Sequence, residues 1–397
     1  TDKLVDHAMK LIDSPGHAGR TRVIRIAANR RLGMGKQLAQ RTSNGILKGA
    51  IGPKLPHVAS QGAGLGLLPQ LGATPTEQRR ADGQQEGKGL RYALGAQQVD
   101  AALRVSDGTG TLALTKVGTG SITISGANTY TGATTIAQGT LVLTVTNSLP
   151  NASPVTIGGG TLSLGIFSQT LSSFTLASGT LTASTGILGL TSSLSAFVVQ
   201  SGTVAATLPS SASLVKSGAG TVTLAAVNQY TGVTSVTNGV LSLGINGALP
   251  ATAVSISGGA ILNLATTAQT AGAVTLLDGT IASTTGTLTA TSYAVQSGTI
   301  SARLAGSGGL AKTTNASLTL SGANTFTGGT VVEGGLVRAL AATSLGVGPA
   351  EITGGRLELA GGATFANVFK VDANGRLDGN PGAVISGLLA GEGELAG

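Results

Sequence analysis

The sequence predicts an all-β protein whose C-terminal part, residues 106–397, folds as a parallel right-handed β-helix of about fifteen turns. Three observations lead to this fold class. A repeat of about twenty residues runs through this part, each repeat pairs a turn glycine with an alternating strand, and the 397 residues include 63 Gly but no Cys or Trp. Because only 3% of the residues are aromatic and 10% are charged, the core must be built from aliphatic side chains.

The short repeat begins with a glycine, or once with Ala316, and places Leu, Ile or Val two residues later, as in GTLVL, GTVTL and GRLEL. The intervals from Gly120 to Gly393 average about 19.5 residues. A turn residue followed by period-two alternation predicts one turn and one strand in each repeat. The glycines are expected at the corners of the turns, where a positive φ favours them. They are Gly120, Gly139, Gly160, Gly179, Gly202, Gly220, Gly239, Gly259, Gly279, Gly298, Gly334, Gly355, Gly375 and Gly393.

A single repeat of this length is not stable alone. Ordering it costs about 1–2 kcal/mol per residue, whereas each buried aliphatic side chain returns about 1.5–3 kcal/mol. Stacking solves the problem, because each strand pairs with its counterpart in the next repeat and the aliphatic columns merge into one core. A propeller blade needs about 40–50 residues, and a leucine-rich horseshoe needs a helical half-repeat. The β-helix is therefore the architecture that fits.

A longer repeat occurs three times, in segments 114–136, 214–236 and 310–332. The lysines of the three copies are five turns apart, and we expect them to be isolated solvated charges. The asparagines are expected in turns, where Asn tolerates the left-handed conformation and can bond its own backbone. We interpret all of these positions as structural markers. They are Lys116, Lys216 and Lys312; Asn128, Asn228 and Asn324; Tyr130, Tyr230 and Phe326; and Gly132, Gly232 and Gly328.

The pattern L-x-K-x-G-x-G-x-[IVL]-x-[IL] followed by N-x-[YF]-T-G resembles the autotransporter-associated β-strand repeat of Gram-negative surface proteins. Thr314 and Ala316 replace the two glycines of this pattern in the third copy. The resemblance implies a passenger that crosses an outer-membrane β-barrel translocator and is displayed outside the cell, anchored at the outer membrane. It also implies adhesion to a host or matrix glycan or protein, or self-association. We expect the translocator to lie outside this sequence and the repeat array to be truncated at its C-terminus.

Residues 1–105 have a different composition. They hold 16 Lys or Arg and 7 Asp or Glu, a balance of +9, whereas the remainder holds 8 and 9, a balance of −1, so the positive net charge of the chain comes from this segment. Short helices are expected within residues 4–12 and 89–105, and the rest is expected to be a basic arm of low order. No aromatic residue lies among the basic residues 19–31, so we expect no nucleic-acid partner. The composition shift predicts a domain boundary after residue 105.

Few residues are suited to catalysis. The lack of Cys excludes thiol nucleophiles and Cys-ligated zinc, the three His lack metal-site spacing, and no G-x-S-x-G elbow or phosphate loop occurs. We therefore expect no cofactor and no metal.

One carboxylate pair is the exception. Glu358 and Asp378 are 20 residues apart, as are Arg356 and Arg376, while Glu394 falls in the arginine column one turn further. Two carboxylates about 5 Å apart match the separation in retaining glycosidases, so a polysaccharide-acting β-helix enzyme is one alternative. The other explanation is that Arg and acidic residues on adjacent strands neutralise each other. We favour this second explanation and a protein that is not an enzyme.

Threonine-rich segments such as TLTASTG and TIASTTGTLTATS suggest a further alternative, a flat surface that binds ice or another repetitive ligand. Thr is also simply a good strand residue, and we expect the T-x-T columns not to continue from turn to turn. An exposed edge strand favours self-association. The sequence thus favours a surface-displayed structural and adhesive rod.

Overall fold

The computed structural model describes residues 9–12, 22–26, 90–94 and 111–396. The described residues form strands joined by turns, and the chain divides into two units, Thr1–Thr191 and Ser192–Gly397. Each unit is a parallel β-solenoid, and together they hold about 14 turns of about 20 residues. This confirms the predicted fold class.

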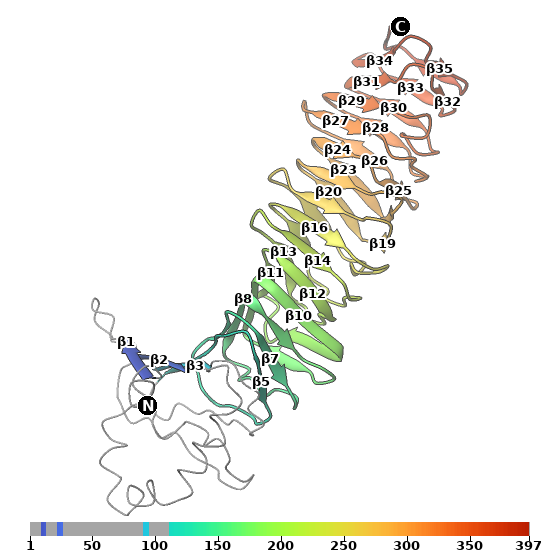
Figure 1. Ribbon diagram of the computed structural model, residues 1–397. Coiled ribbons are helices and arrows are strands. Elements are labelled where there is room, and N and C mark those ends of the chain that lie inside the picture. The colour runs from blue at the N-terminus through green and yellow to red at the C-terminus, as the bar shows by residue number, and fades with distance from the viewer. Residues whose placement is uncertain (1–8, 13–21, 27–89, 95–110, 397) are drawn as a thin grey trace, which may run out of the picture. The chain divides into compact units, whose positions relative to one another are not determined.

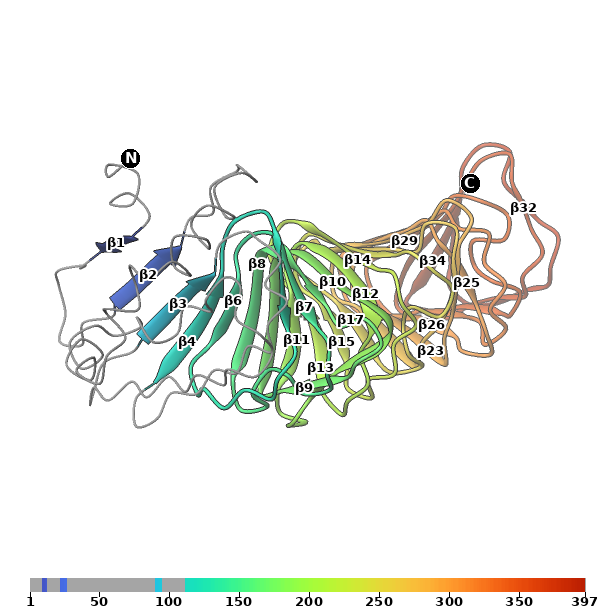
Figure 2. The ribbon, with the colours of Figure 1, turned by 60° about the horizontal axis from the view of Figure 1, so that its bottom comes forward.

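In the first unit, strands of successive turns pair in parallel on three faces. Figure 2 shows β4, β6 and β8 of the first face side by side. The first ladder contains β1 (Met9–Ile12), β2 (Arg22–Ile26), β3 (Leu90–Leu94), β4 (Leu112–Lys116), β6 (Thr134–Ile136) and the first parts of β8 (Pro154–Ser163) and β10 (Ser173–Leu190). The second ladder contains β5 (Ser121–Ile124), β7 (Thr140–Leu143) and later parts of β8 and β10, and the third pairs β9 (Gln169–Leu171) with the end of β10.

The second unit repeats this arrangement, and Figure 1 shows its strands stacked turn on turn. Its first ladder contains β11 (Ala196–Val199), β13 (Ser213–Lys216), β15 (Thr234–Val236), β17 (Val254–Ile256), β20 (Ala273–Leu276), β23 (Ser292–Val295), β26 (Leu310–Lys312), β28 (Thr330–Val332), β30 (Ala350–Ile352), β33 (Phe369–Val371) and β36 (Leu389–Gly391). Its second ladder contains β12 (Gly202–Thr207), β14 (Thr221–Leu224), β16 (Val240–Leu243), β18 (Ile261–Asn263), β21 (Thr280–Ala282), β24 (Gly298–Ile300), β27 (Ser317–Leu320), β29 (Leu336–Ala339), β31 (Gly355–Leu359), β34 (Gly375–Gly379) and β37 (Glu394–Ala396). The third face holds β19 (Ala268–Thr270), β22 (Thr287–Thr289) and β25 (Arg303–Ala305), followed by β32 (Thr364–Phe365) paired with β35 (Val384–Ile385).

The core consists of aliphatic columns that run from turn to turn, as the alternating pattern predicts. In the second ladder of the first unit, Ile122, Leu141, Leu162 and Leu181 lie in register and are buried. The intervening residues face outward, because successive side chains of a strand point to opposite faces. Each turn thus buries one face of its strands against the turns on either side.

Turn glycines are required for two different reasons. Gly139 and Gly239 each have φ of 65°, the left-handed region that favours glycine, which confirms the prediction at these corners. Gly132 and Gly232 do not have a positive φ, but an added Cβ would lie 2.3 Å from the Leu112 carbonyl oxygen and 2.5 Å from that of Ala212. At these two positions glycine is needed because the neighbouring turn approaches so closely.

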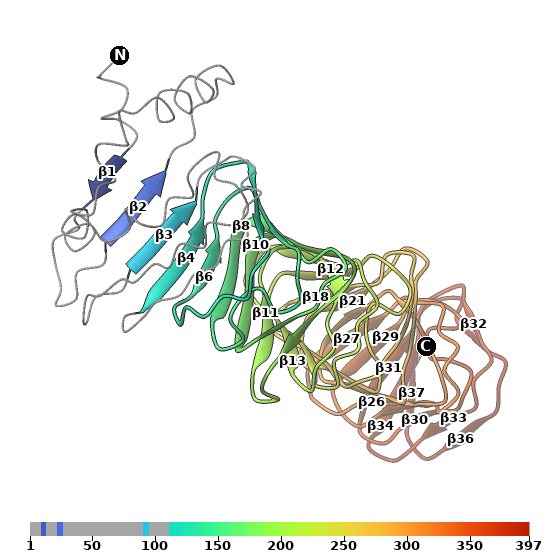
Figure 3. The same ribbon diagram turned by 90° about the horizontal axis from the view of Figure 1, so that it is seen from below.

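The short helices expected in the N-terminal segment are wrong wherever the structure describes them. Residues 9–12 form β1, which pairs antiparallel with β2, and residues 90–94 form β3, which pairs in parallel with β4 (Figure 3). The first turn of the solenoid would otherwise leave the backbone groups of β4 unpaired, and added strands satisfy them. The rest of the expected basic arm, and the boundary after residue 105, lie outside the described residues.

Candidate functional site

The three repeated lysines are fully buried, so the expectation of solvated charges was wrong. Lys116, Lys216 and Lys312 are the last residues of β4, β13 and β26, and each lies at an inward position two residues after a buried Leu. The alternation of the strand was therefore the signal that could have placed them. A count of the turns between the lysines could not show on which face of the strand they lie.

Each buried ammonium is held by carbonyl oxygens of two successive turns. The Nζ of Lys216 donates to the carbonyls of Ser217 at 3.0 Å and Gly218 at 2.7 Å in its own turn, and to that of Asn238 at 2.7 Å in the next turn. Lys116 makes the same three contacts with Val117, Gly118 and Gln138, and Lys312 contacts Thr314 and Gly334.

Burial lowers the pKa of Lys116, Lys216 and Lys312 below that of an ordinary lysine. The carbonyl oxygens replace the water that a buried cation loses. Each lysine therefore ties one turn to the next.

The repeated asparagines make a second connection between turns. Asn228 accepts a hydrogen bond from the Leu208 backbone N–H at 3.1 Å and donates through Nδ2 to the Ala248 carbonyl at 2.8 Å. It also donates to the Ala226 carbonyl two residues before it, which is the local contact expected from the sequence. Asn324 has the same cross-turn contacts, with Leu304 and Ser344. One asparagine thus links three successive turns.

The repeated aromatic residues are buried in the core. The Tyr130 hydroxyl lies 2.5 Å from Thr134 Oγ1, and the Tyr230 hydroxyl lies 2.7 Å from Thr234 Oγ1. Burial raises the pKa of both tyrosines above the ordinary value. The third copy has Phe326 instead, and its ring lies 5.9 Å from that of Tyr293.

Two buried glutamines were missed in the sequence. Gln169 Oε1 accepts the Leu149 backbone N–H at 3.0 Å and its Nε2 donates to the Leu149 carbonyl at 2.9 Å. Gln269 accepts the Leu249 N–H at 3.0 Å in the same way. The two glutamines are 100 residues apart, the spacing of the first two long repeats, and this spacing was the signal that could have found them.

The segments that carry these buried Lys, Asn and aromatic residues match a known family. Residues 114–143, 214–243 and 310–339 match the family described as Passenger-associated-transport-repeat. The chain carries three passenger-associated transport repeats. In each transport repeat the polar connections described above lie inside the solenoid, where they tie successive turns together.

The chain is also similar to a curated protein, the adhesin BmaC autotransporter of Brucella suis biovar 1 (strain 1330). The two are 36% identical over 254 residues, which cover 57% of this chain and 7% of the relative. The chain thus spans about 7% of the length of the curated relative it matches. No solved structure matches the chain. The solenoid thus carries autotransporter passenger repeats and is similar to part of an autotransporter adhesin.

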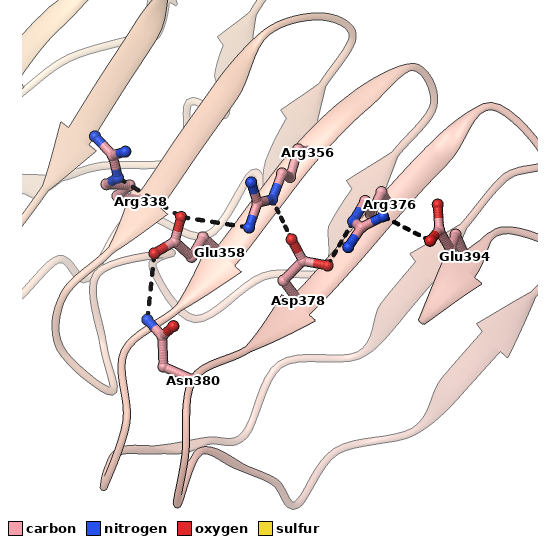
Figure 4. Close-up of polar contacts among 7 residues, drawn as sticks. All are labelled: Arg338, Arg356, Glu358, Arg376, Asp378, Asn380 and Glu394. Atoms are coloured by element: carbon pink, nitrogen blue, oxygen red, sulfur yellow. Dashed lines mark hydrogen bonds and ion pairs between the residues drawn. The ribbon is translucent and has the colours of Figure 1, made fainter. Parts of the chain in front are cut away.

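The carboxylate pair lies where the sequence placed it. Glu358 and Asp378 are direct register partners on β31 and β34, Arg356 and Arg376 are partners in the next column, and Arg376 is aligned with Glu394 on β37. Figure 4 shows that Arg356 reaches between the two carboxylates. The two acids therefore do not face each other across an open gap.

Every acid in this group is paired with arginine. We call the group the charged ladder; it consists of Arg338, Arg356, Glu358, Arg376, Asp378 and Glu394. The buried Asp378 accepts from Arg356 through one carboxylate oxygen and from Arg376 Nε at 2.7 Å through the other. The hydrogen bond with Asp378 raises the pKa of Arg376 above its ordinary value. Glu358 contacts Arg356 at 3.8 Å. The outer contacts are Arg338 at 3.6 Å and Asn380 at 3.3 Å on Glu358, and Glu394 at 2.6 Å on Arg376.

The first unit carries an uncharged, hydroxyl-rich surface on its second ladder. Two outward columns run through β5, β7, β8 and β10. Of these four strands only β10 has the T-x-T pattern at these positions, so T-x-T columns do not continue from turn to turn, as expected. The β8–β10 pairing is irregular near Ser178, but the same offset of 19 residues holds before and after it, so the columns stay aligned. Within residues 111–191 the buried Lys116 is the only charged side chain. We call this surface the hydroxyl face. Its columns are Ser121, Thr140, Thr161 and Thr180, and Thr123, Val142, Ser163 and Thr182.

The structure describes only some of the other residues that the sequence analysis considered for metal or membrane sites. The three His lie outside the described residues. Within the described ranges, no three His, Cys, Asp or Glu side chains gather as metal ligands would. The described part of the chain also has no helix with the length and apolar character needed to cross a membrane.

Proposed function

We propose that this chain works as a surface-displayed adhesive segment of an autotransporter passenger. The observation that carries the proposal is the presence of three transport repeats in a β-solenoid that is similar to an autotransporter adhesin. The proposal includes passage through an outer-membrane β-barrel translocator and display outside the cell, anchored at the outer membrane. Because the chain spans only a small part of its relative, these properties of the whole protein are part of the proposal.

The buried polar contacts support a scaffold role outside the cell. A chain without Cys has no disulfides to stabilise it, and the Lys, Asn and Gln contacts connect successive turns instead. A transport repeat can therefore form its links from residues within a few turns, without a distant partner. This suits a chain that folds turn by turn as it emerges from a translocator.

The hydroxyl face supplies the surface that we propose for adhesion. Its rows of Ser and Thr offer donors and acceptors in register, spaced by about 4.8 Å between strands and about 6.6 Å along a strand. Without charged side chains, this face does not repel a neutral partner. The partner we propose is a neutral hydroxylated surface, either a host or matrix glycan or protein, or the same face of a second copy.

The proposed function involves no catalysis. Glu358 and Asp378 are held by arginine side chains, as charge neutralisation between neighbouring strands requires. A glycosidase pair instead needs one carboxyl group free to protonate a leaving group and another free to attack or to activate water.

A second candidate function is binding of a repetitive solid such as ice. The specific observation that favours it is one column of the hydroxyl face, in which Ser121, Thr140, Thr161 and Thr180 lie in register over four turns of the first unit. An assay of ice recrystallisation in the presence of the purified chain separates the two functions. Inhibition at low concentration supports the second candidate, and unchanged crystal growth leaves adhesion as the proposed function.

The test of the proposed function is display of the chain on bacteria, fused upstream of an autotransporter barrel. We expect added protease to remove the chain from intact cells, and displaying cells to aggregate or to bind glycan-coated and matrix-coated surfaces. The matched control displays an unrelated folded domain of similar size through the same barrel. Protection from protease, or binding no stronger than that of the control, would overturn the proposal.

A further inference from the structure

The turn at Asn238 and Gly239 lies directly against a buried cation. The Lys216 ammonium donates at 2.7 Å to the backbone carbonyl oxygen of Asn238. The next backbone N–H, that of Gly239, donates at 2.7 Å to the side-chain oxygen Oδ1 of the same asparagine. The Asn238 side chain is exposed and is folded back over the amide that follows it. The carbonyl, the amide nitrogen and the side-chain amide of this turn thus lie beside the cation of the preceding turn.

We propose that Lys216 promotes the conversion of Asn238 into isoaspartate, which makes this turn a modification site. In the first step, hydroxide takes the proton of the Gly239 amide, and the nitrogen attacks the side-chain carbon Cγ of Asn238. The bond from Cγ to the side-chain nitrogen breaks, and ammonia leaves with a proton from water. The product is a five-membered succinimide ring.

In the second step, water adds to the backbone carbonyl carbon of Asn238, and the bond from this carbon to the Gly239 nitrogen breaks. The nitrogen stays bonded to Cγ, so the main chain now runs through the side chain. The former backbone carbonyl becomes a free carboxylate. The overall reaction consumes one water molecule, releases one ammonia molecule and involves no oxidation or reduction.

Lys216 acts on the backbone carbonyl group of Asn238, which takes part in both steps. When the Gly239 amide loses its proton, the negative charge is shared with the carbonyl oxygen of Asn238, which the buried ammonium already contacts. A fixed positive charge in a site of low dielectric stabilises such a developing anion. The same contact polarises the carbonyl for attack by water in the second step. The new carboxylate forms against the ammonium, so a neutral contact becomes an ion pair.

The close approach of the neighbouring turn requires glycine at position 239, whereas the residue before it differs among the three repeats. A Cβ on Gly239 would lie 2.5 Å from the Gly220 carbonyl oxygen. Gly139 and Gly335 occupy the same place in the other transport repeats, with similarly close contacts. The preceding residue is Gln138 in the first repeat and Gly334 in the third. Attack on the side chain of Gln138 would close a larger ring, because Gln has one more methylene group than Asn. Gly334 has no side-chain amide to attack. Of the three repeats, the middle one therefore carries the reactive residue.

Two other Asn–Gly pairs in the described residues lack this arrangement. The Gly247 N–H donates to the Ala268 carbonyl at 3.0 Å, and the Asn246 side-chain oxygen accepts the Ala268 N–H at 2.9 Å. Both reacting groups are therefore held by the neighbouring turn. In the third pair, the N–H of Gly375 donates to the Asp372 carbonyl at 2.7 Å. Asn246 is thus a matched control in the same protein.

The test follows deamidation of the full chain at neutral pH and body temperature, by peptide mapping with mass spectrometry that separates aspartate from isoaspartate. In the folded chain we expect Asn238 to react at least about tenfold faster than Asn246, which corresponds to about 1.4 kcal/mol of transition-state stabilisation. In concentrated guanidinium the two rates should become equal. The isoaspartate share at position 238 should be higher in the folded than in the unfolded chain.

A transplant gives an independent test. The Gln138→Asn substitution places an exposed asparagine before Gly139, where the Lys116 ammonium contacts the carbonyl of residue 138. We expect this asparagine to react at a rate close to that of Asn238. The proposal is overturned if Asn238 reacts no faster in the folded chain than in guanidinium, or if the transplanted asparagine reacts no faster than Asn246.

Discussion

The Tyr230 hydroxyl lies 2.7 Å from Thr234 Oγ1 inside the second transport repeat. In the third repeat Phe326 has no hydroxyl, and Thr330 Oγ1 donates instead to the Leu345 carbonyl at 3.0 Å. The buried threonine is therefore satisfied in both repeats, by different partners. The second and third transport repeats thus show two ways in which the buried threonine hydroxyl is hydrogen-bonded.

This comparison predicts the effect of removing the tyrosine hydroxyl. Tyr230→Phe should lower the free energy of unfolding by about 1 kcal/mol, because it leaves the Thr234 hydroxyl to find another partner. Adding Thr234→Val should recover most of this loss, since replacing both partners by apolar groups is nearly neutral. Urea unfolding of Tyr230→Phe, Thr234→Val and the double variant measures the effect. A double variant that loses as much as the sum of the two single changes would contradict this account.

The buried lysines should be more important for stability than an exposed one. Lys216→Met removes the donor shared by three carbonyl oxygens, and we expect a loss of about 1–3 kcal/mol. The matched control is Lys370→Met, because Lys370 is exposed and pairs with Asp372 at 3.3 Å. This change should cost less than about 1 kcal/mol. Hydrogen exchange across residues 214–243 measures the difference, and equal protection in both variants would count against the proposed role of the buried lysine.

The buried tyrosines predict loss of stability in strong alkali. Burial raises the pKa of Tyr293 to about 12, against an ordinary value of 10.0, despite hydrogen bonds with backbone groups of Ala305 and Ala290 that lower it. Because the folded pKa is the higher one, this contribution, about 3 kcal/mol, is complete below pH 10 and is lost between about pH 10 and 12. The lowered pKa of Lys216 acts in the opposite direction, and adds stability as the pH rises towards 10.5.

We therefore expect the net decline to begin above about pH 10.5. Circular dichroism and tyrosinate absorbance, recorded together against pH, should change in parallel. Tyr293→Phe, compared with the parent chain, should move the midpoint of unfolding to higher pH. Tyrosinate absorbance of all four tyrosines that rises near pH 10 while the strand signal persists would show that the buried tyrosines are not protected as described.

The charged ladder should act in stability and not in catalysis. Asp378→Asn leaves Arg356 and Arg376 without their shared carboxylate, and we expect a loss of about 1–3 kcal/mol confined to the last turns. Glu394→Gln is the control, since Glu394 is exposed and an exposed pair adds little to stability. Limited proteolysis of residues 350–396 measures the effect. Polysaccharide turnover by the parent chain that disappears in a Glu358→Ala/Asp378→Ala variant would instead support the enzyme alternative.

The periodicity of the sequence predicted the fold because each turn of a solenoid repeats the same pattern of a turn glycine and an alternating strand. Glycine spacing and alternation placed the turns and strands, and the same spacing placed Glu358 beside Asp378. The burial of Lys116 was missed because a count of turns shows which residues are neighbours but not whether a side chain faces in or out. The hydroxyl face was missed because its columns mix Ser, Thr and one Val, whereas the sequence was searched for Thr in the T-x-T pattern alone.

We propose the hydroxyl face as the adhesive surface of the displayed solenoid. A triple variant, Thr140→Lys, Thr161→Glu and Thr180→Lys, puts alternating charges on three register-matched outward positions. Opposite charges on adjacent strands attract each other, so the fold should persist. The matched control places the same charges on the second unit, with Val240→Lys, Ile261→Glu and Thr280→Lys.

The decisive measurement is the number of cells that adhere or aggregate when each variant is displayed at equal surface density. We expect the triple variant of the hydroxyl face to lose adhesion while the control keeps it, and both purified chains to retain the strand signal in circular dichroism. Equal adhesion by the parent chain and the triple variant would contradict the account.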